Sequence, residues 1–465
     1  MGLGSNSSQV ALPRRIRHGF WPLSFSARCS TCTRALDAHQ LDRLNLRGVT
    51  RFSMDEDERE VGRAAARTVL AGLVGRSDVA AFVGLTPRAL KFYLFRLKSS
   101  RRYVKFELRK RAGGVREIRA PIPPIKRAQK LIAEHLAAFY EPRRSVYGYI
   151  PGRSIVGNAT CHSAKRWVLR VDLQDFFPSI NFGRVRGLLL AAPFSLPPEA
   201  ATTIAQLCVD ENQLPQGSPA SPIISNIVCR GLDKALAELA RTHRCSYTRY
   251  CDDIVFSTNR ASFPRSLAHL EEAGEGRTTA VIGDALLQAI TQAGFRVNEA
   301  KTQLRPKSQC QMVTGLVTNL RVNVPRKFVL EVRQLLHAWG KLGTIGASDW
   351  FFAKHDKRNR PAGKKRPEFE MVVRGKVQHI GSVKGWGDPI YRRFSKQLQA
   401  LDPRFRPHAN SLLHAHVELH VFTEGKTGAD PVSRTPDGAS KLPESGTWQN
   451  SERSTRKNSS GTRCG

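Results

Sequence analysis

The chain has 465 residues, of which 40% are hydrophobic, so it is long enough for two or three compact units and too apolar to be disordered throughout. Its 74 lysine and arginine residues against 39 aspartate and glutamate residues leave a net charge of +35, which favours a polyanionic partner such as nucleic acid. No apolar run approaches the roughly 18 residues of a membrane span, and the N-terminus has arginines without the apolar stretch of a secretory signal. Because the nine cysteines are mostly isolated and resemble reduced thiols, we expect a cytoplasmic protein with no membrane contact.

The beginning of the chain predicts an extension with little regular structure. Residues 1–60 are rich in Ser, Arg and Gly and have few periodic apolar positions, which is typical of loops and disordered segments. Cys29 and Cys32 supply half of a zinc site, but no second pair follows at zinc-finger spacing. We therefore favour reduced thiols over a structural zinc.

Helical spacing begins after this extension. Between 61 and 100 the apolar residues recur at three- and four-residue intervals, which predicts an N-terminal helical segment. Thr86 followed by Pro87 is typical of a helix N-cap and first turn. Strand alternation at 103–108 and 115–120, with a glycine-containing turn between them, then predicts a β-hairpin.

The rest of the chain mixes helices and strands and ends in a polar tail. Its patterns predict helices at 126–138, 223–239, 326–342 and 389–401, strands at 167–173 and 247–256 (the latter as a strand pair with a tight centre), and an alternating segment at 313–324. A basic loop at 354–366, together with Trp386 and Tyr391, suits contact with a nucleic-acid duplex. Residues 401–465 predict a mostly disordered basic tail.

Two of the strand segments carry carboxylates at or near their ends. Asp172 belongs to the segment 170–180, and Asp252 and Asp253 lie at the centre of 249–256. Adjacent like charges are costly unless a cation compensates them. Two such segments can hold two Mg²⁺ ions about 3.5–4 Å apart, an arrangement used in phosphoryl transfer. A solvated turn is the alternative for an isolated Asp-Asp pair, but hard oxygen ligands without a nearby His or Cys cluster favour Mg²⁺ over Zn²⁺.

On these residues the chain resembles the reverse transcriptases. Tyr250-Cys-Asp-Asp253 matches the family's Tyr-x-Asp-Asp box, and Asp172 matches the lone metal-binding aspartate of its first palm strand. Three more segments match in family order, namely the fingers motif at 110–121, the Pro-Gln-Gly loop at 214–222 and the Gly-Phe-x-x-Asn-x-x-Lys-Thr segment at 294–302. Five matches in the right order are hard to obtain by chance.

Two shorter motifs resemble those of the bacterial retron-type enzymes. Asn158-Ala-Thr-Cys-His162 matches their Asn-Ala-x-x-His signature, and Val313-Thr-Gly315 matches their Val-Thr-Gly signature. The resemblance implies that the cognate RNA is contacted by residues of both motifs, namely Asn158, His162, Val313, Thr314 and Gly315. A packing role is the alternative for His162, and a simple strand end is the alternative for 313–315.

The resemblance also implies the fold and its divisions. It predicts a right-hand polymerase fold of the α/β (α+β) class, with fingers, an antiparallel-sheet palm and a helical thumb. The fingers and palm would occupy 101–318, and the thumb would occupy 319–400.

The family's site residues carry over to matching positions. The catalytic centre would comprise Asp172, Asp252 and Asp253, as ligands of two Mg²⁺ ions, and Lys301, which would protonate pyrophosphate. The incoming dNTP would be bound by residues from three segments, namely Lys110, Arg116, Phe177, Gln216 and Gly217. Phe177 matches the position that meets the 2′ carbon of the sugar. Simple exposure is the alternative for Lys110, Arg116 and Lys301, and core packing is the alternative for Phe177.

The implied function is RNA-directed DNA polymerisation of the retron type. Such an enzyme copies part of a structured non-coding RNA into single-stranded DNA and acts in anti-phage defence with a separate effector protein. The expected partners are the RNA template and primer, its cDNA and dNTPs. A group II intron-like or abortive-infection reverse transcriptase is the nearest alternative, disfavoured by the two retron motifs and by the absence of a recognisable maturase or endonuclease segment after the thumb. An RNA-binding scaffold is the non-enzyme alternative, and three clustered carboxylates facing a polyanion argue against it.

Overall fold

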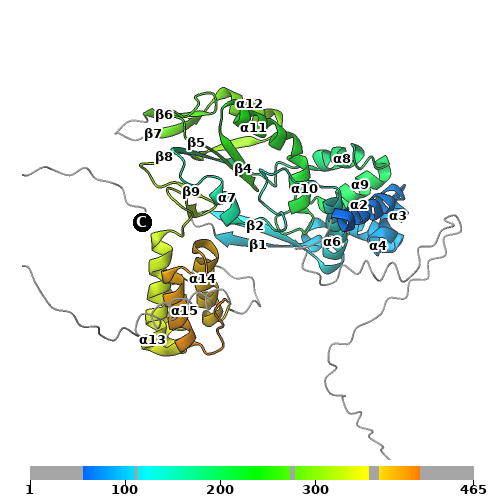
Figure 1. Cartoon of the computed structure of the whole chain (residues 1–465). Coiled ribbons are helices and arrows are strands. Elements are labelled where there is room, and N and C mark those ends of the chain that lie inside the picture. The colour runs from blue at the N-terminus through cyan, green and yellow to red at the C-terminus, as the bar shows by residue number, and fades with distance from the viewer. Residues whose placement is uncertain (1–55, 110–113, 273–277, 356–365, 409–465) are drawn as a thin grey trace, which may run out of the picture. The chain divides into compact units, whose positions relative to one another are not determined.

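The computed structural model describes residues 56–109, 114–272, 278–355 and 366–408 (Figure 1). The predictions for Cys29 and Cys32, for nearly all of 1–60 and of the basic loop at 354–366, and for most of 401–465 therefore lie outside the described residues. Lys110 also lies outside them. Among the described helices, none is long and apolar enough to cross a membrane.

The chain enters the described region through a series of helices, as the apolar spacing of 61–100 predicts. These are α2 (Glu56–Ala71), α3 (Arg76–Phe82), α4 (Pro87–Lys91), the π-helix η1 (Phe92–Arg96) and α5 (Ser99–Arg102). The predicted N-cap is confirmed, because the Thr86 hydroxyl accepts a hydrogen bond from the backbone N–H of Ala89 at 3.1 Å. Leu90 is fully buried and anchors this turn in the core.

The predicted hairpin is confirmed. Strand β1 (Tyr103–Arg109) pairs antiparallel with β2 (Val115–Pro121), from Tyr103 opposite Pro121 to Arg109 opposite Val115. The following helix, α6 (Pro123–Ala138), begins three residues earlier than its apolar pattern indicates. Two prolines fill its first positions, where a missing N–H costs no hydrogen bond.

A four-stranded antiparallel sheet forms the centre of the molecule. Its order is β4 (Ser246–Tyr250), β5 (Asp253–Thr258), β3 (Trp167–Gln174) and β8 (Arg296–Pro306). Because side chains alternate along a strand, Leu169, Val171 and Leu173 of β3 enter the main hydrophobic core. The intervening Asp172 is thereby turned to the opposite face of the sheet.

The main core is covered by helices on the face of the sheet that carries those leucines. They include α8 (Phe182–Leu190), α9 (Pro198–Cys208), α10 (Ser221–Val228), α11 (Arg230–Thr242) and α12 (Asp284–Gln292). A small antiparallel hairpin, β6 (Ala268–Glu272) and β7 (Thr278–Ile282), precedes α12.

The single long helix predicted at 223–239 is wrong, because two helices meet at Cys229, where ψ is 0°. Gly231 weakens helix propagation at this point. The two parts also pack on different neighbours, α10 on α6 and α8 and α11 on β4 and α12. The break at Cys229 therefore lets the apolar faces of α10 and α11 pack against different elements.

The C-terminal part of the described chain has three helices and its own core. They are α13 (Arg326–His355), α14 (Phe369–Lys384) and α15 (Pro389–Leu401), preceded by the short strands β9 (Met312–Val313) and β10 (Leu316–Val317). The helix predicted at 326–342 extends further in the structure, to His355, with a break at Gly343 (φ 66°). Helix α14 was not predicted from the sequence. Valines 373 and 377 of α14 and Tyr391 of α15 are fully buried in this second core.

Tyr391 does not form the nucleic-acid contact that the sequence suggests, because it is fully buried, whereas Trp386 is only partly buried. Their rings pack against each other with centroids 5.2 Å apart. A Cβ atom at Gly381 would overlap both rings, so only glycine allows this close packing of α14. The basic, aromatic composition of the segment reflects a helix junction with an apolar interior.

Candidate active site

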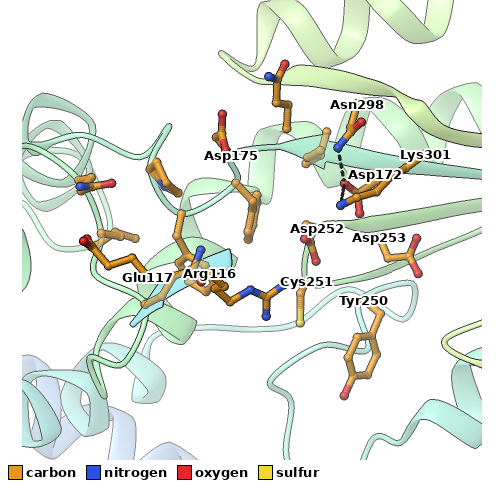
Figure 2. Close-up of a pocket in the computed structure, with 18 of the residues that line it drawn as sticks. Arg116, Glu117, Asp172, Asp175, Tyr250, Cys251, Asp252, Asp253, Asn298 and Lys301 are labelled. Atoms are coloured by element: carbon orange, nitrogen blue, oxygen red, sulfur yellow. Dashed lines mark hydrogen bonds and ion pairs between the residues drawn. The ribbon is translucent and has the colours of Figure 1, made fainter. Parts of the chain in front are cut away.

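A cavity of about 760 Å³ opens beside the sheet at the ends of β3 and β5. Most of the predicted site residues line it, namely Arg116, Asp172, Phe177, Gln216, Asp252, Asp253, Lys301 and Thr314. Segments far apart in the sequence thus converge here, from the β1–β2 hairpin to β8 (Figure 2). Gly217 follows the cavity residue Gln216 in the chain. The other predicted residues of the described chain do not line the cavity, namely Asn158, His162, Val313 and Gly315.

The three aspartates come together because β3 and β5 are neighbours. Asp172 stands opposite Asp253 in the strand register, and the backbone N–H of Leu173 donates to the Asp252 carbonyl at 3.0 Å. Between β4 and β5, Cys251 takes a positive φ of 59°. Because of this tight turn, the side chains of the adjacent residues Asp252 and Asp253 point in different directions (Figure 2).

The pKa values of two of these carboxyl groups are raised. For Asp252 the main cause is burial, followed by the negative charge of Asp172. Burial also raises the pKa of Asp253 to about 6, although the Arg170 guanidinium opposes the shift. Burial and the neighbouring carboxylates thus disfavour the charged forms of both groups, and a cation bound beside them would favour those forms.

Each of two aspartates has a cationic partner from the chain. The Lys301 ammonium lies 2.8 Å from Asp172 Oδ1, and the Asn298 amide donates to the same oxygen at 3.2 Å (Figure 2). Arg170 Nε donates to Asp253 Oδ1 at 3.0 Å. Asp252 has no such direct ion pair within the described part of the chain, and the nearest cations that lower its pKa are Lys301 and Arg116.

The donor set fits a hard divalent cation. Asp172 and Asp252 offer carboxylate oxygens at one edge of the cavity, as Mg²⁺ prefers. Cys251 also lines the cavity, but burial raises the pKa of its thiol to about 11, so it is not a thiolate ligand at neutral pH. In the described chain no three His, Cys, Asp or Glu side chains already converge as a complete metal cage. The reason is that the Asp253 carboxylate forms an ion pair with Arg170, whose side chain lies on the same face of the sheet.

A buried ion pair supports the turn from beneath. Arg249 is fully buried and binds both carboxylate oxygens of Asp233 at 2.7 Å. Its third nitrogen donates to the Cys251 carbonyl at 3.0 Å, so the pair holds the backbone of the residue just before Asp252. The Tyr247 hydroxyl donates to Asp233 as well, at 2.8 Å. The Arg249–Asp233 ion pair was not predicted from the sequence. Two features could have indicated it, namely an arginine within an apolar strand and an aspartate on the apolar side of a helix.

The hairpin is locked to the loop that carries Gln216. The backbone N–H of Arg119 donates to the Gln216 carbonyl at 2.8 Å. Gly217 has φ 130°, and a Cβ atom there would lie 2.8 Å from the Arg119 carbonyl, so this close approach requires glycine. The Arg119 side chain binds Asp210, whose carboxylate is buried, and Glu211. Arg116 on the same strand is thereby positioned relative to the Gln216 loop.

The two adjacent phenylalanines have different environments. Phe176 is buried and stacks on Phe295 with centroids 5.6 Å apart. Phe177 lines the cavity, and its ring lies 6.3 Å from that of Tyr149, a half-exposed residue with φ 61°. Core packing thus explains Phe176, whereas Phe177 presents an apolar ring at the cavity wall beside a second aromatic residue that sequence reasoning missed.

Comparison with known proteins decides the family of this region. Residues 108–316 match the family model described as "Reverse transcriptase (RNA-dependent DNA polymerase)". These residues are thus similar to a reverse transcriptase domain. This range contains all three aspartates, the Gln216 loop and both short motifs.

Curated relatives of the reverse transcriptase domain are retron enzymes, which confirms the resemblance predicted from the motifs. The chain is 34% identical to the retron Mx65 reverse transcriptase of Myxococcus xanthus over 56% of its length and 62% of the relative's. It is 32% identical to the retron Mx162 reverse transcriptase of the same organism, over 57% of its length and 59% of the relative's. The retron Ec86 reverse transcriptase of Escherichia coli is 31% identical over 41% of this chain and 54% of the relative. The chain thus spans about three fifths of the first two relatives.

Among solved structures, telomerase from Candida albicans in complex with a fragment of telomeric RNA matches 70% of this chain and 66% of its own, with 10% identity and a TM-score of 0.34. A likeness at this level carries no argument about the fold.

The first retron motif lies inside the reverse transcriptase domain, where it joins helix α7 (Ile155–Thr160) to the sheet. His162 is fully buried, and its ring nitrogens contact Ser257 Oγ and Thr248 Oγ1, each at 2.7 Å. Burial lowers the pKa of His162 to about 3. Asn158 is buried as well, and its side-chain amide has no hydrogen-bond partner in the described chain. These surroundings favour the packing alternative for His162.

The second retron motif is divided between core and cavity. Val313 is fully buried, whereas Thr314 (φ 47°) lines the cavity and donates to the Ile155 carbonyl at 3.1 Å. Gly315 is exposed with φ 81°, and no atom lies within 4 Å of the position of a Cβ. Of the five residues predicted to contact RNA, Thr314 and Gly315 are therefore the accessible ones.

Proposed function

We propose that this chain is an RNA-directed DNA polymerase of the retron type, which copies part of a structured non-coding RNA into single-stranded DNA. The observation that carries the proposal is the position of Asp172 on β3 and of Asp252 in the turn that leads into the neighbouring strand β5, both at one edge of a large cavity. The matches to reverse transcriptases and to retron enzymes support the substrate class. A separate effector protein and a role in anti-phage defence follow from the retron resemblance alone.

The proposed right-hand arrangement assigns the described elements to three parts. The β1–β2 hairpin would belong to the fingers and the four-stranded sheet to the palm, within 101–318. Helices α13, α14 and α15 would form the thumb, within 319–400. The antiparallel order of the sheet and the separate core of the C-terminal helices support this division.

Asp172, Asp252 and Asp253 would hold two Mg²⁺ ions. Such ions, when bound, lower the pKa of the primer hydroxyl and neutralise the charge of the triphosphate. Asp252 has no ion pair within the described chain, whereas Asp172 is paired with Lys301 and Asp253 with Arg170. By the family resemblance, Asp253 would be the weakest of the three expected ligands.

The other cavity residues would bind and orient the nucleotide. Arg116, with Lys110 on the same hairpin, would clamp the triphosphate. Gln216 and Gly217 would line the nascent base pair, and Lys301 would give a proton to pyrophosphate as it leaves. Thr314, at the cavity wall, and the adjacent exposed Gly315 would contact the cognate RNA.

Substitution of one carboxylate tests the proposal. Asp252→Asn keeps the size of the side chain and removes its charge, so we expect incorporation of dNTPs on an RNA template to fall below about a tenth of wild type, while RNA affinity is kept. Primer extension in Mg²⁺, with RNA binding measured alongside, provides the readout. Asp284→Asn, at the exposed first turn of α12, is the matched control and should extend normally. Full activity of Asp252→Asn would refute the proposed site.

A further inference from the structure

The π-helix η1 presents two aromatic rings to solvent. Phe92 and Phe95 are each 49% exposed, although phenylalanine is among the residues most often buried. Leu90 and Leu94 of the same segment already supply its contacts with the main core. The two outward rings are therefore surplus to the packing of this segment, and π-helical turns are frequent at functional sites.

The part of the chain that carries these rings is rich in positive charge. Residues 79–106 contain seven lysines and arginines and no aspartate or glutamate. Arg102 and Lys105 pair with Asp210 and Glu211. The other five are exposed and have no acidic partner in the described part of the chain, namely Arg88, Lys91, Arg96, Lys98 and Arg101. We call these five cations, with Phe92 and Phe95, the η1 surface.

One ring already has a cation on its face. The Arg76 guanidinium lies 5.0 Å from the ring centroid of Phe95. Aromatic rings interleaved with guanidinium and ammonium groups are the combination by which proteins bind single-stranded nucleic acid, because the rings stack on bases and the cations contact phosphates.

We propose that the η1 surface binds single-stranded RNA, as a second contact site outside the catalytic cavity. A duplex fits less well, because its bases are already stacked and unavailable to Phe92 and Phe95. A protein partner fits less well, because five unpaired cations around two rings favour a polyanion. The proposal rests on the proposed function for the identity of the strand, which would be an unpaired stretch of the RNA template.

The path of the chain connects this surface to the cavity. Helix η1 leads through α5 into β1, whose first residue, Tyr103, pairs with Pro121 at the far end of β2. Arg116 at the cavity lies five residues from Pro121, or about 17 Å along a strand. None of the η1 surface residues lines the cavity, and the β1–β2 hairpin lies between the two sites along the chain. One extended RNA strand would therefore occupy both sites by crossing this hairpin.

Binding of a labelled RNA by the full chain tests the proposal. We expect Phe92→Ala combined with Phe95→Ala to weaken binding of a 20-nucleotide oligouridylate about tenfold or more, measured by fluorescence anisotropy. The dependence of affinity on salt should stay unchanged, because no phosphate contact is lost. Arg96→Gln combined with Lys98→Gln should instead make the slope of log affinity against log salt shallower by about 1.4, at about 0.7 for each contact to a single strand.

Two controls separate stacking from other effects. Leu287→Ala removes a comparably exposed apolar side chain (43%) from α12 and should leave RNA binding unchanged. A duplex RNA of equal length should bind the wild type and the double phenylalanine variant alike.

The outcomes distinguish this proposal from the proposed function. Unchanged oligouridylate affinity in the phenylalanine variant overturns the η1 surface, whether or not the chain extends primers. A changed oligomeric state without a change in RNA affinity overturns it in favour of a protein partner. Weaker single-strand binding with normal extension on a template of one unpaired nucleotide supports it. Equal loss of both activities together with lower thermal stability would show that the rings only stabilise the fold.

Discussion

At the scale of single residues, the neighbouring Phe176 and Phe177 have different surroundings. Phe176 points into the core against Phe295, and Phe177 faces the cavity five positions after Asp172. The alternation of a strand and its following turn suffices to separate two identical side chains in this way. If Phe177 binds the dNTP sugar as proposed, its bulky ring would leave no room and no hydrogen-bond partner for a 2′-hydroxyl.

Substitution of Phe177 should therefore change the choice of sugar. We expect Phe177→Ala to retain appreciable dNTP incorporation and to raise rNTP incorporation about tenfold or more, which corresponds to about 1.4 kcal/mol of lost discrimination. Single-nucleotide incorporation with each substrate measures the ratio. If both substrates are lost in parallel and thermal stability falls, Phe177 is a core residue instead.

His162 should give the protein a measurable acid sensitivity. Its pKa in the folded state is lowered to about 3, so between pH 6.5 and 3 the unfolded chain binds a proton there that the folded chain does not. The free energy of unfolding therefore falls as pH decreases through this window, by about 2 kcal/mol between pH 7.5 and pH 5. His162→Gln should remove this contribution.

Chemical denaturation of the wild type and His162→Gln at several pH values measures the difference. The gap between their stabilities should narrow by about 2 kcal/mol from pH 7.5 to pH 5, because all other titrating groups are shared. Parallel pH profiles would mean that the pKa of His162 is the same in the folded and the unfolded protein.

At the scale of elements, the turn between β4 and β5 depends on a helix behind the sheet. Asp233 of α11 holds Arg249, which in turn holds the Cys251 carbonyl. Removing one member of a buried pair leaves the other charge uncompensated, at a cost of about 3–5 kcal/mol. Asp233→Asn should accordingly lower the free energy of unfolding by that amount.

A paired substitution separates stability from positioning. Asp233→Leu combined with Arg249→Met should regain much of the lost stability, since apolar side chains of similar volume can replace a buried ion pair. Primer extension should stay reduced, because the Cys251 carbonyl still lacks its donor. Glu238→Gln, which removes an exposed ion pair from the same helix, serves as control in denaturation experiments and should change little. Full activity of the paired variant would show that the turn holds its shape without Arg249.

The elements also show what the sequence can and cannot predict. Alternation and turn residues predicted the β1–β2 hairpin, β3 and the β4–β5 pair. The carboxylates at the ends of two strand segments predicted that Asp172 and Asp252 would converge, and the family resemblance implied that Gln216 would join them. The break at Cys229 was not predicted, because continuous apolar periodicity does not reveal that α10 and α11 pack on different neighbours. The Arg249–Asp233 pair was missed for a similar reason, since burial of a charge depends on contacts between segments 16 residues apart.

At the scale of the whole molecule, two cores share the central sheet. Leu169 and Ile254 belong to the first, and Val168 and Val255 on the opposite face belong to the second, to which α13, α14 and α15 contribute. The three carboxylates Asp172, Asp252 and Asp253 lie at the edge of the sheet where the candidate active-site cavity opens. A net charge of +35 over the chain gives this arrangement a strong attraction for a polyanion.

The nucleic acid that co-purifies with the intact protein tests the central claim most directly. We expect a structured RNA together with a single-stranded DNA complementary to part of it, identified by sequencing after separate RNase and DNase treatment. Expression of Asp252→Asn should yield the same RNA without the DNA. Bound RNA with no complementary DNA in the wild type, or the same DNA in both preparations, would contradict RNA-directed synthesis at this site.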